Sequence, residues 1–173
     1  PHSLGVFYES FTQLIGFKNY GDEYKMMGLS SFGKPEYYDL IINHVFSKEN
    51  NCKLNLDYFN HTNKNYSYKF EGQPNQSDMY NEKLEKLLNV KDLKINQITD
   101  VHKNIAASAQ KVFEKKLLEI CNEINDMNIS KNLVYAGGCA LNSLANKKLF
   151  ESNLFNNIFI PYAPGDGGGS IGS

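Results

Sequence analysis

The sequence has 173 residues, 41% hydrophobic and 21% charged, which is enough to bury a core and excludes a chain of disordered composition. Its 18 basic and 19 acidic residues leave a formal net charge of -1, so the charge balance favours no nucleic-acid or anionic-membrane partner. No apolar run reaches the roughly 20 residues of a membrane span, and three scattered cysteines without a CxxC pair fit a cytoplasmic protein better than a disulfide framework or a zinc site.

The first part of the chain predicts three amphipathic helices. Apolar residues recur at helical spacing between an N-cap at Ser3 and a stop at Gly16. A second helix begins near Asp22. A third covers Glu36–Phe46, with a proline just before it that suits the first turn of a helix.

The middle of the chain has a different composition, rich in Asn, Lys and Tyr over residues 47–97. Alternating residues in Lys53–Tyr58 and Tyr66–Phe70 predict two short strands, and a helix is expected over Asp78–Leu88. We interpret this stretch as a small α+β insertion within a single domain that spans residues 1–173.

The last part alternates helices with apolar strands. The longest helical pattern covers residues 98–128, and His102 is expected on the surface of that helix. An apolar run then meets the pair Gly137-Gly138, a helical pattern follows at once, and a second apolar run lies at Asn157–Pro161. This order predicts an α/β layer.

Two glycine clusters are the features most typical of a functional site. Gly137 and Gly138 place bare N–H groups at the carboxyl end of a strand, where α/β proteins bind phosphates, although a tight connection would use the same pair. Asp166 precedes Gly167 and Gly168 in the second cluster. Consecutive glycines are entropically unfavourable unless a ligand or another backbone comes close.

The polar residues near these clusters leave alternatives open. Asp166 either binds a metal or a phosphate-bound cation, or it caps a turn or helix. Asn142 is either a solvated helix residue or an amide that reads a ribose or a phosphate. Glu23 and Lys25 are equally consistent with an ordinary exposed pair. Cys139 is either a thiol whose pKa is lowered at a helix N-terminus or a buried small residue.

Five motifs, taken in order, resemble the NodU/CmcH family of O-carbamoyltransferases: PHSLGVFYESFTQLIGF, EYKMMGLSSFGKPEY, IAASAQKVFE, NLVYAGGCALNSLANKKL and PYAPGDGGGSIG. The resemblance covers roughly the first 46 residues and the last 75, and the stretch between them only loosely. It implies an α/β fold of the actin-like ATPase class (ASKHA, ribonuclease-H-like). The chain would be the second, C-terminal lobe of a Kae1-like region.

The resemblance also implies a function. Such proteins make carbamoyl-adenylate from carbamoyl phosphate and ATP in a YrdC-like domain. Their Kae1-like region transfers the carbamoyl group to a hydroxyl of a small-molecule acceptor, beside a divalent metal that is usually iron. By position, Asp166 becomes a metal ligand, and no catalytic residue is assigned. The positions implied in nucleotide binding are Gly137, Gly138, Asn142, Glu23, Lys25, Gly28, Gly33, Gly167 and Gly168.

The chain departs from the family pattern in two respects. The histidine motif that supplies the other metal ligands has no match, and the YrdC-like domain is absent. Because Pro1 is not an initiator, we expect an excised piece that needs the first lobe and the YrdC-like domain of the same protein for activity. Two alternatives stay open: an ASKHA phosphotransferase, such as a sugar or acetate kinase, and a non-catalytic nucleotide-binding lobe.

Overall fold

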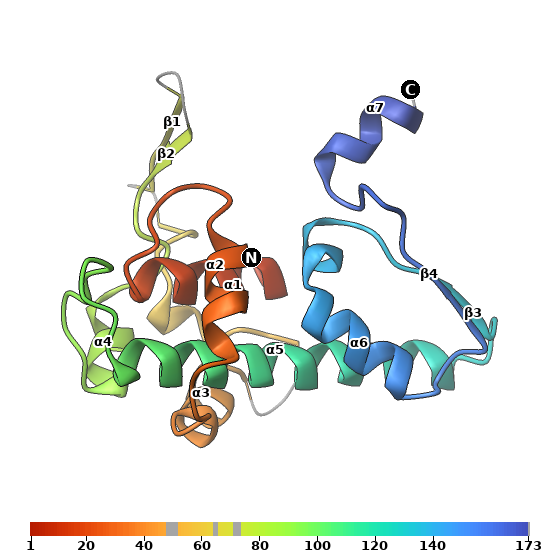
Figure 1. The fold of residues 1–173 in the computed structure, drawn as a ribbon, viewed down its shortest axis with the longest axis horizontal. Coiled ribbons are helices and arrows are strands. Elements are labelled where there is room, and N and C mark those ends of the chain that lie inside the picture. Colours follow the sequence, from red (N-terminus) through yellow and green to blue (C-terminus); the bar gives the residue numbers. More distant parts are fainter. Residues whose placement is uncertain (48–51, 64–65, 71–73, 173) are drawn as a thin grey trace. The chain divides into compact units, whose positions relative to one another are not determined.

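The computed structural model (Figure 1) describes residues 1–47, 52–63, 66–70 and 74–172. The chain forms two compact units, Pro1–Val112 and Phe113–Ser173, and each is described by itself. The long helix α5 (Asp100–Asp126) contributes residues to both, and the helix predicted over residues 98–128 is therefore confirmed.

The first helix, α1 (Leu4–Leu14), has the ends that the sequence predicts. The Ser3 hydroxyl accepts hydrogen bonds from two amides of the first turn, at 3.1 and 3.4 Å. At the other end Gly16 has a φ of +94° and donates its N–H to the carbonyl of Gln13 at 2.9 Å.

Three shorter α-helices lie in the described part of the first unit: α2 (Glu23–Ser30), α3 (Tyr38–His44) and α4 (Glu82–Leu88). The helix predicted from Asp78 begins instead at Glu82, because Asn81 is its N-cap. The Asn81 side chain accepts a hydrogen bond of 2.9 Å from an amide of the first turn.

In the described part of the middle segment, the strand β1 (Tyr68–Phe70) pairs antiparallel with the strand β2 (Pro74–Gln76). The strand predicted over Tyr66–Phe70 is confirmed in its last three residues, and its partner is the strand that the sequence pattern missed. Parts of the 47–97 prediction, at residues 48–51, 64–65 and 71–73, lie outside the described residues.

The strand predicted over Lys53–Tyr58 is wrong. Leu54 makes only an isolated bridge, and the 3₁₀ turn η1 (Leu56–Tyr58) follows. The side chain of Asn55 accepts a hydrogen bond from the N–H of Asp57 at 3.2 Å. Such local bonding competes with the strand ladder, and here it closes a turn.

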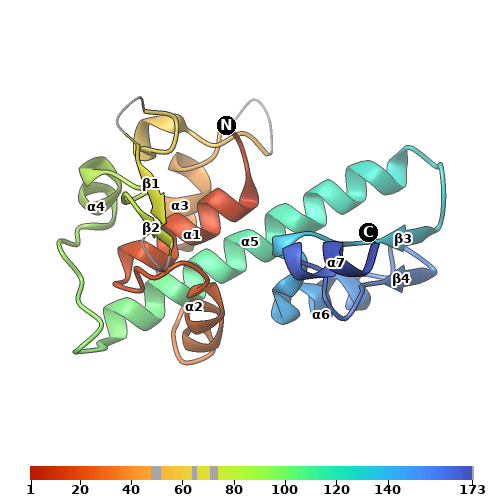
Figure 2. The same ribbon diagram turned by 90° about the horizontal axis from the view of Figure 1, so that it is seen from above.

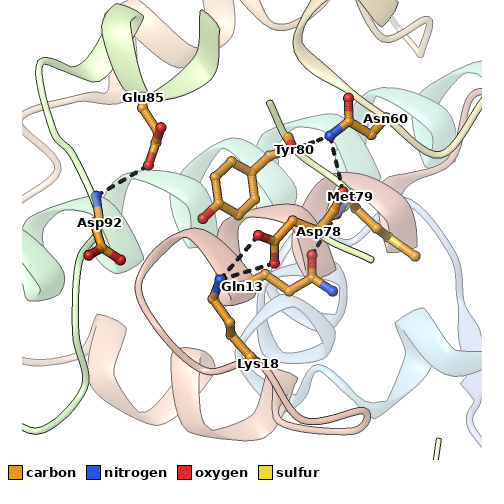
Figure 3. A network of polar contacts seen from close by, with 8 residues as sticks. All are labelled: Gln13, Lys18, Asn60, Asp78, Met79, Tyr80, Glu85 and Asp92. Atoms are coloured by element: carbon orange, nitrogen blue, oxygen red, sulfur yellow. Dashed lines mark hydrogen bonds and ion pairs between the residues drawn. The ribbon is translucent and has the colours of Figure 1, made fainter. Parts of the chain in front are cut away.

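The middle segment is built into the first unit (Figure 3). The N–H of Met79 donates to the buried Gln13 side chain of α1 at 2.7 Å. Lys18 pairs with the carboxylate of Asp78 at 3.1 Å, and the Asn60 amide donates to the Asp78 carbonyl at 3.2 Å. The network thus joins α1 and the loop after it to residues that lie 60 or more positions later in the chain.

The core of the first unit also draws on every part of its sequence. α1 lies beside the first half of α5 (Figures 1 and 2), and the Tyr8 hydroxyl of α1 donates to the buried Gln110 side chain of α5 at 2.6 Å. Buried apolar side chains of this core are Phe7, Phe11, Leu14, Ile15, Met26, Ile41, Val45, Phe46, Leu54, Phe59, Leu84, Leu88, Ile105, Ala109 and Val112.

The second unit contains a parallel β–α–β arrangement. After α5 its elements are β3 (Asn132–Val134), the 3₁₀ turn η2 (Gly138–Leu141), α6 (Ser143–Glu151), β4 (Asn157–Phe159), the 3₁₀ turn η3 (Asp166–Gly168) and α7 (Gly169–Gly172). β3 and β4 lie side by side in both views (Figures 1 and 2), with Leu133 opposite Ile158. The strand, glycine turn and helix order is confirmed, except that η2 separates the glycine pair from α6.

Candidate functional site

The two glycine turns of the second unit lie just beyond the carboxyl ends of neighbouring parallel strands (Figure 1). The strand pairing continues past β3, since the N–H of Tyr135 donates to the carbonyl of Phe159 at 3.0 Å. The N–H of Gly137 then donates to the carbonyl of Pro164 at 2.7 Å. This bond joins the loop after β3 directly to the loop after β4.

The fold requires glycine at some positions of these turns and not at others. Gly137 has φ +97° and ψ 170°, a region of backbone conformation that is essentially restricted to glycine. A Cβ on Gly168 would lie 2.2 Å from the carbonyl oxygen of Ala163. A Cβ on Gly138 or Gly167 would meet no atom within 4 Å. Among these four glycines, the described part of the structure therefore explains Gly137 and Gly168, and it does not explain Gly138 and Gly167.

The same two unexplained positions carry free backbone donors. No hydrogen bond from the N–H of Gly138 or Gly167 is found among the described residues. Donors at the carboxyl end of parallel strands, with open space beside them, are the groups that bind phosphate oxygens in α/β proteins. The geometry is therefore that of a candidate anion site.

Asn142 is the N-cap of α6. Its Oδ1 accepts a hydrogen bond from the N–H of Ala145 at 3.0 Å, and the residue is only 7% exposed. Asn142 is therefore not a solvated helix residue. Its side chain fixes the start of α6 directly after η2.

Asp166 begins η3 and is exposed. In the described part of the chain its carboxylate makes no hydrogen bond or ion pair, and it caps neither η3 nor the helix after it. The capping interpretation of Asp166 is therefore not supported, and the carboxylate is available to a ligand.

Cys139 is not an activated thiol. It lies half-buried in η2, and burial raises its pKa. Burial also raises the pKa of the Tyr135 hydroxyl, and the charges of Cys139 and Cys121 raise it further. This hydroxyl has no hydrogen-bond partner among the described residues. The interpretation of Cys139 as a buried small residue is the one that fits.

The two candidate glycines of the first unit also differ. A Cβ on Gly33 would lie 2.0 Å from the carbonyl oxygen of Lys103, so Gly33 permits the loop after α2 to touch α5. Gly28 is exposed inside α2, with nothing within 4 Å of a Cβ. A glycine in a helix interior costs about 1 kcal/mol relative to alanine. No contact in the described part of the unit offsets that cost at Gly28.

Lys25 pairs with Asp22 and not with Glu23. The Lys25 Nζ lies 2.6 Å from the Oδ1 of Asp22, and this hydrogen bond raises the pKa of Lys25. The carboxylate of Glu23 makes no hydrogen bond or ion pair with any described residue. The sequence singled out Lys25, whereas Asp22 was noted only as the start of a helix.

His102 is another residue that the sequence misplaced. It is 3% exposed, so the expectation of a surface histidine is wrong. Its Nδ1 accepts the backbone N–H of Thr99 at 3.1 Å and contacts the Thr99 hydroxyl at 2.9 Å. A Thr followed three residues later by a side-chain acceptor is the signal that could have shown this contact at the start of α5.

A metal cluster and a membrane span are both missing from the described residues. Among the described residues, no group of three or more His, Cys, Asp or Glu side chains could hold a metal ion. The helices of that same part of the chain are all too short or too polar to cross a membrane.

Comparison with known proteins identifies the family. A family model described as "Carbamoyltransferase N-terminus" matches residues 1–173. The chain is 38% identical over 181 residues to an uncharacterized protein of Synechocystis sp., covering 100% of the chain and 27% of that protein. It is 26% identical over 180 residues to nodulation protein NolNO of Sinorhizobium fredii, covering 99% of the chain and 22% of that protein.

A second nodulation protein, NolO of Bradyrhizobium diazoefficiens, is 26% identical over 175 residues, which cover 99% of the chain and 28% of that protein. The chain thus spans about a quarter of the length of these relatives. The family match extends over the whole chain, and it agrees with the resemblance that the five motifs indicate. The chain belongs to the carbamoyltransferase N-terminus family.

Proposed function

We propose that this chain is part of an O-carbamoyltransferase. The full-length protein would transfer a carbamoyl group from carbamoyl-adenylate, made from carbamoyl phosphate and ATP, to a hydroxyl of a small-molecule acceptor. The observation that carries the proposal is the pair of glycine turns joined by the Gly137–Pro164 hydrogen bond, in a chain of the carbamoyltransferase N-terminus family.

These turns suit the nucleotide phosphates. The N–H groups of Gly138 and Gly167 are free within the described residues, and no side chain occupies the space beside them. A phosphate bound by such donors needs no compensating cation for each oxygen, because the backbone dipoles supply the positive potential. For the first unit, described by itself, the family resemblance implies nucleotide contacts of Lys25 and Gly28.

The reaction follows from that assignment. The acceptor hydroxyl oxygen forms a bond to the carbamoyl carbon, the bond from that carbon to the phosphate oxygen breaks, and AMP leaves while the hydroxyl loses its proton. Donors held on the leaving phosphate stabilise the negative charge that develops there. No residue of this chain is assigned as the base.

The family resemblance also implies a divalent metal. The exposed Asp166 carboxylate, free of partners in the described residues, fits one oxygen ligand of such an ion. A single carboxylate is not a complete donor set, so further ligands would come from outside this chain. When bound, the metal would supply Lewis-acid polarisation of a carbonyl or phosphoryl oxygen.

Product analysis of the full-length protein tests the function. We expect mass spectrometry of acceptor candidates, incubated with enzyme, ATP and carbamoyl phosphate, to show a carbamoylated acceptor together with AMP. ADP with a phosphorylated acceptor would indicate an ASKHA phosphotransferase instead. If the protein bound nucleotide but turned over no substrate, the interpretation as a non-catalytic nucleotide-binding lobe would be favoured.

A matched pair of variants tests the metal ligand. Asp166→Ala should lower both the metal content and the turnover of the full-length protein. Asp126→Ala removes another exposed carboxylate of the second unit and should change neither. Unchanged metal content and turnover in Asp166→Ala would remove Asp166 from the site.

A further inference from the structure

The parallel sheet of the second unit has one covered face and one bare face. Side chains along a strand point alternately to the two faces of its sheet. Leu133 and Ile158 lie opposite each other in β3 and β4, and both are half-buried. Val134 and Phe159 form the next pair in the register, and they are 71% and 63% exposed. The face that carries Val134 and Phe159 is therefore the bare one.

The covered face is the one that meets α5. Tyr135 comes two residues after Leu133 and shares its face, and its N–H continues the pairing with β4 through the carbonyl of Phe159. Burial raises the pKa of the Tyr135 hydroxyl, and the charge of Cys121 raises it further. Cys121 belongs to α5 and is itself buried. The helix α5 thus covers the face of Leu133 and leaves the opposite face open.

The bare face is polar at one end and apolar at the other. Asn132 and Asn157 lie opposite each other at the start of the strands, and the Asn157 amide donates to the Oδ1 of Asn132 at 2.7 Å. These two exposed side chains bond to each other. The apolar pair Val134 and Phe159 follows at the carboxyl end of the strands, which is also the end that leads into the glycine turns.

The sequences of the strands indicate burial on both faces. Each strand lies in a continuous apolar run, Leu133–Ala136 in the first and Ile158–Ile160 in the second. Continuous apolar runs are typical of parallel strands with both faces covered, whereas a half-exposed strand alternates apolar with polar residues. Single exposed apolar side chains are common on protein surfaces. An exposed pair in register on a parallel sheet is not, because such sheets occur almost only with both faces covered.

We propose that an amphipathic helix of the full-length protein, from the part outside these 173 residues, packs its apolar side on Val134 and Phe159. The chain spans about a quarter of the length of its relatives, so most of a protein of that size lies outside it. A helix is the expected cover, because the connections between parallel strands place helices on the faces of the sheet.

The size of the patch favours this occupant over a second copy of the chain. A specific interface between two proteins buries roughly 800 Å² on each partner. A large aromatic side chain buries roughly 150–250 Å², so Val134 and Phe159 together fall far short of that area. A segment of the same polypeptide needs no such area, since it is present at a high effective concentration. The inference does not depend on what the glycine turns bind.

Thiol labelling of the full-length protein tests whether the face is covered. Val134→Cys places a thiol of similar size on the bare face, and Ile129→Cys is the matched control, an 83% exposed apolar position of the same unit outside the sheet. A water-soluble maleimide is added, and peptide mass spectrometry gives the rate at each cysteine, divided by its rate in denaturant. We expect Val134→Cys to react at least about tenfold more slowly than Ile129→Cys, because a covered thiol reacts only when the cover opens. Equal rates would overturn the proposal.

Photocrosslinking identifies the cover. Benzoylphenylalanine in place of Phe159 keeps an aromatic ring at the patch and reacts with whatever lies on it. We expect a cross-link within one polypeptide, to a peptide outside residues 1–173. A cross-link between two copies, or to a residue within 1–173, would show that the proposed occupant is wrong.

A measurement on the unchanged protein covers the case in which the variants fail to fold. Hydroxyl radicals oxidise exposed phenylalanine rings, and mass spectrometry gives the oxidation rate of Phe159 in the native and the denatured full-length protein. Burial under a helix predicts a native rate at least about tenfold below the denatured one. A native rate within about twofold of the denatured rate, as a 63% exposed ring would give, contradicts the proposal.

Discussion

The backbone N–H of Gly137 donates a hydrogen bond of 2.7 Å to the carbonyl oxygen of Pro164. The bond links two turns that the helix α6 and the strand β4 separate in the chain. It also directs the Gly137 N–H away from any ligand. The N–H of the next residue, Gly138, is the one that stays free among the described residues, so the two glycines of the pair have different roles.

This difference predicts opposite behaviour of two variants. Gly138→Ala should leave the free energy of unfolding within about 0.5 kcal/mol, because the new methyl group meets nothing. It should weaken ATP binding about tenfold, since that methyl group stands where a phosphate would approach. Chemical denaturation and ATP titration of the full-length protein measure the two effects.

Gly137→Ala is its counterpart. Alanine at φ +97° and ψ 170° is strained by about 1–3 kcal/mol, so this variant should lose stability as well as affinity. The assignment of Gly138 to the nucleotide would be wrong if Gly138→Ala bound ATP with normal affinity.

Two substitutions at Asn142 separate its role as the N-cap of α6 from its proposed role in ATP binding. Asn142→Ala should destabilise the protein by about 1 kcal/mol, because the N–H of Ala145 loses its cap. Asn142→Asp keeps a capping oxygen and should keep most of the stability. Its added negative charge beside η2 should nonetheless weaken ATP binding.

Denaturant titration and ATP titration of both variants check this. Equal ATP affinity for Asn142→Asp and the unchanged protein would place the phosphate away from the start of α6.

The attachment of the middle segment predicts unequal effects of two changes in the same network (Figure 3). Gln13→Ala should cost about 1–3 kcal/mol, since the N–H of Met79 is left without its buried acceptor. Lys18→Ala should cost less than about 1 kcal/mol, because its ion pair with Asp78 is exposed. Equilibrium unfolding gives both values, and the reverse order would show that the segment is held by charge.

The buried His102 predicts a loss of stability in mild acid. Burial lowers its pKa from the ordinary value of 6.5, so between that lowered pKa and pH 6.5 the unfolded chain binds more protons than the folded chain. The stabilising contribution is therefore complete above pH 6.5 and is lost as the pH falls through the folded pKa. Thermal unfolding from pH 7.5 down to 5 measures it.

His102→Gln keeps an acceptor at the same helix position and should reduce the pH dependence of stability. His2→Gln replaces an exposed histidine and should leave the pH dependence of stability unchanged. A pH dependence that persists unchanged in His102→Gln would assign it to other groups.

Local signals in the sequence determined most helices and the outline of the site. Ser3 and Gly16 marked the ends of α1 because capping and left-handed backbone depend on residues next to one another. The strand, glycine pair and helix were readable for the same reason. The middle segment was misjudged where Asn55 closes a turn with its own side chain, since alternation alone does not show that bond.

The tertiary structure decided which contacts each candidate residue makes. No pattern shows that Gly33 faces the backbone of α5, that Gly137 bonds to Pro164, or that Lys25 pairs with Asp22 and not with Glu23. These contacts join segments that only folding brings together, or depend on rotamers that neighbouring elements fix. The sequence by itself placed the glycines and charges at the carboxyl ends of strands and the start of a helix. Only the packing of distant backbone separated the glycines that the fold requires from Gly28, Gly138 and Gly167, which are left open to a ligand.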